Sequence, residues 1–117
     1  MADRVLVVFG GLCGATGVAL SAVATHAGGA NVGTAASFLL MHAPAFLALG
    51  LAARGQALRL AGLALLLGVL TFCGDLLMRD YAGARLFPMA APAGGVLMIF
   101  GWLAVAASAL AARRTGD

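Results

Sequence analysis

LAGLALLLGVLTFCGDLLM, residues Leu60–Met78, contains a single formal charge, Asp75. The hydrocarbon core of a bilayer is about 30 Å thick, and a helix of about 20 apolar residues crosses it. A helix of a soluble protein also needs a polar face, which this stretch lacks. The stretch therefore predicts a membrane-spanning helix. Asp75 needs an explanation there, because an ionisable group inside a membrane span is energetically costly.

The composition of the whole chain agrees with this class. Of its 117 residues, 63% are hydrophobic and 9% are charged, and the mean hydropathy is +1.07. In soluble proteins, about a quarter of the residues are charged. The net charge of +3 comes from arginine alone, since the chain has neither Lys nor Glu. The arginines occur singly or as one terminal pair, without the basic stripe of a nucleic-acid-binding surface, so we expect no nucleic-acid partner.

Four segments are long and apolar enough to span a bilayer. They cover approximately residues 5–25, 33–53, 58–78 and 91–112. Arg54–Ala57 predicts a tight turn, and a longer loop follows from Arg79 to Ala90. Pro92 suits the first turn of the fourth segment, where its missing N–H loses no partner. The sequence thus predicts one domain, residues 1–117, with the fold of an all-α membrane protein: a bundle of four transmembrane helices.

Arginine placement predicts the orientation of this bundle. One side holds five arginines and the other side two: Arg4, Arg54, Arg59, Arg113 and Arg114 against Arg79 and Arg85. Because cytoplasmic loops are enriched in Arg and Lys, we expect an N-in/C-in protein of the bacterial inner membrane, with both termini cytoplasmic. A cleaved signal peptide ending near Ala22-Val23-Ala24 is the competing interpretation of the first segment. Its apolar stretch is longer than a usual signal core.

Small residues recur on one face of the first segment and in the fourth. The positions that we expect to support helix packing are Gly10, Gly14, Gly17, Ser21, Gly94, Gly95 and Gly101. Small residues spaced in this way let two helix backbones approach closely. Two interpretations stay open: packing inside one bundle, which is favoured, and contact between subunits.

Four polar residues form a candidate cluster: His26, His42, Asp75 and Arg79. On the predicted topology, both histidines and Asp75 fall in the outer half of the bilayer. The favoured hypothesis is a polar clamp, in which Asp75 pairs with Arg79 at i,i+4 and accepts a hydrogen bond from a histidine of a neighbouring helix. A proton relay or ion site is the second hypothesis, and a metal or haem site is the third.

The remaining signals argue against bound groups and against catalysis. No Cys/His spacing of a metal site is present, and Cys13 and Cys73 fit buried free thiols better than a disulfide. We therefore expect no metal and no cofactor. A GxSxG motif, a P-loop and a pair of carboxylates on one surface are all missing, so the sequence predicts no enzyme.

The last third of the chain carries the most specific pattern. Pro88-Met-Ala-Ala-Pro92-Ala-Gly94-Gly95 precedes Phe100-Gly101-Trp102, and upstream stand Phe72-Cys-Gly74-Asp75-Leu76, Met41-His42-Ala43 and Ala22-Val-Ala-Thr-His26. In this order they resemble the YgdD-like family of small bacterial four-helix membrane proteins, catalogued as domain of unknown function 423. The resemblance implies the four-span fold and brings no established activity. The family often has a small polar residue such as serine where Asp75 stands, which weakens the case for obligatory carboxylate chemistry.

These observations favour a non-enzymatic structural or accessory subunit. The expected partners are the lipid bilayer and other membrane helices, in a homo-oligomer or a larger complex. The alternative is a small oligomeric transporter, channel or proton-coupled module that uses His26, His42 and Asp75.

Overall fold

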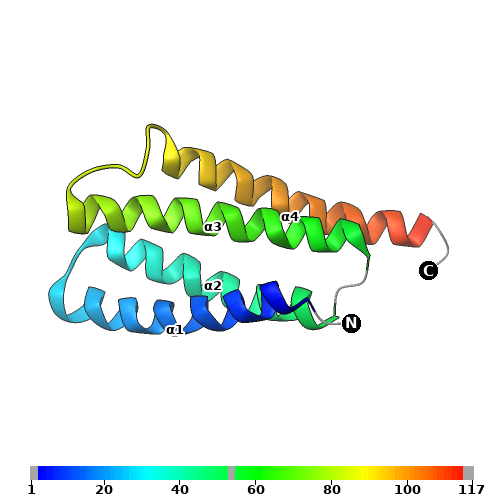
Figure 1. The fold of residues 1–117 in the computed structure, drawn as a ribbon, viewed down its shortest axis with the longest axis horizontal. Coiled ribbons are helices and arrows are strands. Elements are labelled where there is room, and N and C mark those ends of the chain that lie inside the picture. Colours follow the sequence, from blue (N-terminus) through cyan, green and yellow to red (C-terminus); the bar gives the residue numbers. More distant parts are fainter. Residues whose placement is uncertain (1–2, 53–54, 115–117) are drawn as a thin grey trace.

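A computed structural model describes residues 3–52 and 55–114. Within them the chain forms α1 (Arg4–Ala27), α2 (Ala30–Ala52), α3 (Gln56–Ala82) and α4 (Ala90–Arg114), with no strand in these ranges (Figure 1). Each of these four helices is long and apolar enough to cross a membrane. The prediction of an all-α chain with four such helices is confirmed.

The helices are arranged as two neighbouring hairpins. α1 packs against α2, and α3 packs against α4, while contact between the hairpins runs mainly through α2 and α3. Figure 1 shows these hairpins side by side, with the beginning of α1 and the end of α4 at the same end of the molecule. The long dimension of 52 Å follows the helix axes, and the other two are 27 and 18 Å. α2 and α3 are thus the central pair, and α1 and α4 flank them.

Burial follows this order. Half of the apolar window of α3 and 39% of that of α2 is buried inside the molecule, against 22% for α1 and 17% for α4. The flanking helices therefore expose apolar side chains, including Val18 on α1 and Phe100 on α4. A large exposed apolar surface is typical of a helix that contacts lipid or another helix.

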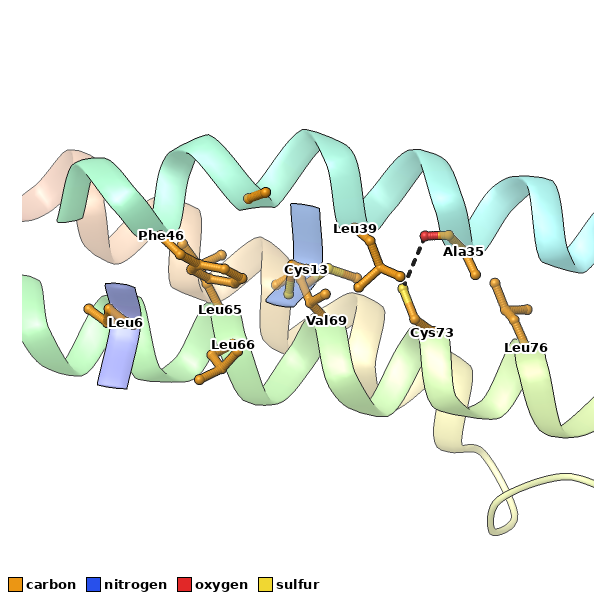
Figure 2. Packing of buried hydrophobic residues seen from close by; sticks show 12 residues of the cluster. Leu6, Cys13, Ala35, Leu39, Phe46, Leu65, Leu66, Val69, Cys73 and Leu76 are labelled. Carbon is orange, nitrogen blue, oxygen red and sulfur yellow. Dashed lines mark hydrogen bonds between the residues drawn. The ribbon is translucent and has the colours of Figure 1, made fainter. Parts of the chain in front are cut away.

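The core lies mainly between α1, α2 and α3, and Met98 of α4 adds to it. Figure 2 shows Phe46 against Leu65 near one end, and Leu39 close to Cys73 near the other. Cys13 and Cys73 are free, buried thiols, and the Cys73 thiol donates to the carbonyl oxygen of Ala35 over 3.6 Å. Both cysteines therefore serve as small core residues.

Glycines set the closest approaches between helices. A Cβ added at Gly17 of α1 would lie 2.7 Å from Cγ of Leu40, and one at Gly94 of α4 would lie 2.7 Å from the backbone nitrogen of Phe72. A Cβ at Gly101 would lie 2.8 Å from Cγ of Leu65 in α3, and one at Gly10 would lie 3.1 Å from Leu47 in α2. These glycines pack inside the molecule, as van der Waals packing of small-residue faces requires.

Three other predicted packing positions are looser. A Cβ at Gly14 would lie 3.7 Å from that of Ala43, an ordinary contact distance, and Ser21 is half-buried. Gly95 differs from the expectation, since a Cβ there would meet no atom within 4 Å. It sits one residue after Gly94, so a helical turn of about 100° per residue moves it away from α3.

Two helix boundaries differ from the predicted ones by three residues or more. α3 continues past Met78 to Ala82, so Arg79 is helical and not part of a loop, and Gly83 ends the helix in the left-handed conformation at φ 69°. α2 begins at Ala30, three residues earlier than predicted. Both extensions have a polar cause, described below. The predicted end of the second span at Ala53, with Arg54, lies outside the described residues.

Candidate functional site

Asp75 is fully buried in α3 and has two partners. Nη2 of Arg79, one helical turn away, lies 2.8 Å from Asp75 Oδ2. Oδ1 accepts a hydrogen bond of 2.8 Å from the backbone N–H of Leu86, in the loop that precedes α4. The carboxylate therefore joins α3 to the α3–α4 loop, and an ion pair at i,i+4 supports the last turns of α3.

The ion pair uses one guanidinium nitrogen only. The side chain of Arg79 is 31% exposed, and its Nε is buried without a hydrogen-bond partner among the described residues. A bidentate pair would have used Nε as well. Asp75 and Arg79 thus form a close contact between charges that falls short of the strongest geometry available to them.

The prediction that Asp75 accepts a hydrogen bond from a histidine of a neighbouring helix is wrong. A backbone amide takes that position, because the loop folds back over α3 far enough for Leu86 to reach the carboxylate. The side chain of Leu86 lies against the same part of the helix, 3.6 Å from where a Cβ of Gly74 would be. A main-chain donor needs no side-chain entropy to hold it, so it replaces the imidazole that the sequence seemed to require.

His42, only 2% exposed in α2, has both ring nitrogens engaged. Its Nδ1 lies 2.8 Å from the carbonyl oxygen of Phe38, and the indole Nε1–H of Trp102 donates to its Nε2 over 3.1 Å. A carbonyl oxygen only accepts, so Nδ1 carries the proton and Nε2 is the acceptor. These partners assign the neutral Nδ1–H tautomer, and a second proton at Nε2 would face the indole donor.

Trp102 is the functional partner that sequence reasoning missed. It stands in α4, sixty positions from His42, and its ring centroid is 5.6 Å from that of the imidazole. The backbones of α2 and α4 do not pack directly on each other. Trp102 therefore bridges a gap that no other hydrogen bond of the described residues crosses. Its membership of the Phe100-Gly101-Trp102 pattern was the available signal, but that pattern names no partner.

His26 lies apart from the other candidates. It is exposed in the last turn of α1, and no hydrogen bond or ion pair among the described residues joins it to Asp75 or His42. The predicted cluster therefore separates into an Asp75–Arg79 pair, a His42–Trp102 pair and a single surface histidine.

Asp80 is a second residue that sequence reasoning missed. Its Oδ2 accepts a hydrogen bond of 3.0 Å from the N–H of Val32, and its Oδ1 accepts one of 2.9 Å from Nδ2 of Asn31. The first N–H groups of a helix have no partner within the helix, so Asp80 caps the start of α2 from the end of α3. This cap explains the early start of α2.

Asp3 has the equivalent role at the opposite end. It caps α1 by accepting from the N–H groups of Val5 and Leu6, and it pairs with Nε of Arg59 in α3 at 2.7 Å. Partial burial raises the pKa of the Asp3 carboxyl. The hydrogen bond from Leu6 and the charge of Arg59 outweigh that effect, so the pKa lies below its ordinary value. Asp3, Asp75 and Asp80 therefore all accept hydrogen bonds from backbone amides.

A groove of about 220 Å³ between α1, α2 and α3 has an apolar lining that includes Phe9, Leu12 and Leu70. Cys13 and Cys73 also line it, but His42 and Asp75 do not. Across the described ranges, no group of three or more His, Cys, Asp or Glu side chains is placed to hold a metal ion. The polar pairs thus lie within helix contacts and away from this groove.

Comparison with known families matches residues 13–95 to the family described as protein of unknown function, DUF423. The chain belongs to the DUF423 family. The matched region includes all four candidate polar residues of this DUF423 protein and ends before Trp102. No curated protein and no solved structure matches the chain.

Proposed function

We propose that this DUF423 protein is a multi-pass protein of the bacterial inner membrane with a non-enzymatic, structural or accessory role. In this role it associates with itself or with a larger membrane complex, and both of its termini are cytoplasmic. The observation that supports the proposal best is the use of the buried polar groups. Asp75 and His42 are engaged by Arg79, Leu86, Phe38 and Trp102, all within the fold.

Membrane insertion is supported by the exposed apolar faces of α1 and α4. An aqueous surface with so many large apolar side chains would aggregate, whereas a bilayer accommodates them. The internal hydrogen bonds of the four helices satisfy the main-chain groups that a bilayer cannot. The placement of the arginines supports the N-in/C-in orientation.

Association with other helices is supported by two small residues on the exposed faces. A Cβ added at Gly11 of α1 or at Gly95 of α4 would meet nothing within 4 Å. Such positions allow the backbone of a neighbouring helix to approach closely. They are separate from Gly17 and Gly94, which are occupied by contacts inside the molecule.

The alternative role, a transporter or proton-coupled module, receives less support. It requires His26, His42 and Asp75 to line one pathway. His42 and Asp75 instead have separate partners, His26 lies apart on the surface, and the 220 Å³ groove has an apolar lining. Proton relays need titratable groups within hydrogen-bond reach of each other or of bridging water.

Native mass spectrometry of the protein extracted from its host membrane in mild detergent tests the proposal. We expect a stoichiometric assembly larger than the 11.6 kDa monomer. Gly11→Leu or Gly95→Leu should weaken that assembly while helicity by circular dichroism stays unchanged. A wild-type protein found only as a monomer would rule out the accessory role. Proton flux into liposomes that is lost in Asp75→Ser would favour the transporter instead.

A further inference from the structure

Two adjoining hollows run along the outer face of α4 where it meets α3. One, of about 560 Å³, is lined by Met89, Pro92, Ala93, Val96, Leu97 and Phe100. The other, of about 350 Å³, shares Ala93 and Leu97 and extends to Leu67 and Phe87. The hollows adjoin each other at these two shared residues and are lined mainly by apolar side chains; together they are called here the α4 groove.

The α4 groove adjoins the α3–α4 loop, which carries the positive charge of Arg85. Phe87 and Met89 are among the residues that line the groove, and Arg85 stands two residues before Phe87, exposed to solvent. The two nearby carboxylates are already engaged, Asp75 by Arg79 and Asp80 by the first turn of α2. Arg85 forms no ion pair with any described residue.

We propose that the α4 groove is a binding site for an anionic phospholipid. One acyl chain lies in the groove along Ala93, Val96 and Phe100, and the guanidinium of Arg85 donates to the phosphate of the headgroup. An apolar channel that leads to a single cation has the chemistry of such an amphipathic ligand. The inference rests on the proposed membrane insertion and not on the accessory role.

A second protein helix is a weaker occupant for this groove. It would need its own carboxylate at the depth of Arg85, whereas an anionic lipid brings phosphate and hydrocarbon in one molecule. The positive end of the α4 helix dipole, at Ala90, adds to the field of Arg85 at the same place.

Native mass spectrometry of the full-length protein, titrated with phosphatidylglycerol or with phosphatidylcholine of the same acyl chains, tests this site. The wild type should bind phosphatidylglycerol more tightly. Arg85→Gln should lower that affinity about fivefold, the value of one arginine at a membrane surface. Arg4→Gln is the matched control, because Arg4 is also exposed and has no ion pair with a described residue, yet lies at the opposite end of the molecule.

Two further arms separate headgroup from chain. Ala93→Phe fills the part shared by both hollows and should weaken the binding of both lipids, while circular dichroism shows intact helices. Excess inorganic phosphate should not displace phosphatidylglycerol, since free phosphate lacks the acyl chain.

The proposal would be overturned by equal affinity of the wild type for the two lipids, or by equal losses in Arg85→Gln and Arg4→Gln. Displacement by phosphate, or an Ala93→Phe variant that loses a protein partner but keeps lipid binding, would also overturn it. The same spectra report assembly. A monomer that prefers phosphatidylglycerol rejects only the accessory role, and an assembly without lipid preference rejects only this site.

Discussion

His42 and Asp75 are the two buried polar side chains in the core of the described residues, and each is costly to bury unless it is hydrogen-bonded. Each has one partner from another element: Trp102 of α4 for His42, and Leu86 of the α3–α4 loop for Asp75. Removing such a partner leaves a buried group without a hydrogen bond, which costs more than the bond itself contributes. Single substitutions can therefore measure these contacts.

Trp102→Phe should destabilise the protein by about 1–3 kcal/mol, because it keeps an aromatic ring but leaves Nε2 of His42 without a donor. Equilibrium unfolding in detergent, followed by circular dichroism, measures this. Phe100→Leu is the control, since Phe100 is an exposed neighbour in the same helix and should change stability by less than about 0.5 kcal/mol. Equal effects of the two substitutions would show that the indole N–H is not used.

Helix ends in this protein depend on capping from a distance. Asp80→Ala should cost about 1 kcal/mol and raise the hydrogen-exchange rate of the Val32 amide, because the start of α2 loses its acceptor. Asp80→Asn retains an oxygen and should have a smaller effect. Asp3→Ala is the matched control and should raise exchange at Val5 and Leu6, not at Val32. Unchanged exchange at Val32 in Asp80→Ala would contradict the cap.

Two neighbouring glycines of α4 should differ in how much the same substitution destabilises the protein. Gly94→Leu forces side-chain atoms into the backbone of α3 and should unfold or strongly destabilise the α3–α4 hairpin, by more than about 3 kcal/mol. Gly95→Leu enters open space and should leave the unfolding free energy within about 1 kcal/mol. The measurement is thermal unfolding in detergent, and the reverse order of effects would mean that α4 is rotated about its axis.

The four helices could be predicted from the sequence because the length of an apolar stretch is a local property of the chain. The runs around Leu65 and Phe46 are long and uncharged, so the four helices follow from composition alone. Asp75 with Arg79 follows from i,i+4 spacing. Asp80 with Val32 and His42 with Trp102 join residues 48 and 60 positions apart, and such contacts depend on how the hairpins pack. The placement of Leu86 over Asp75 depends on the path of a loop, which has no periodic signal.

The whole molecule has a charge asymmetry that predicts its direction in the membrane. Green fluorescent protein fused after residue 117 should fluoresce, and alkaline phosphatase fused there should be inactive, because we propose that the arginine-rich side faces the cytoplasm. A phosphatase fusion after Gly83, in the α3–α4 loop, is the control and should be active. An active phosphatase at the C-terminus would reverse the orientation and place Arg85 on the cytoplasmic side.

The central claim is that the buried carboxylate of Asp75 stabilises the fold through Arg79. A double-mutant cycle of Asp75→Asn and Arg79→Gln, measured as unfolding free energy in detergent, tests it most directly. We predict that each single variant loses about 2–3 kcal/mol and that the double variant loses about 1–3 kcal/mol less than their sum, since the two groups interact. An Asp75→Asn variant that is more stable than the wild type would contradict the claim. Removal of a charge that is retained for function, at a cost in stability, is expected to stabilise the protein.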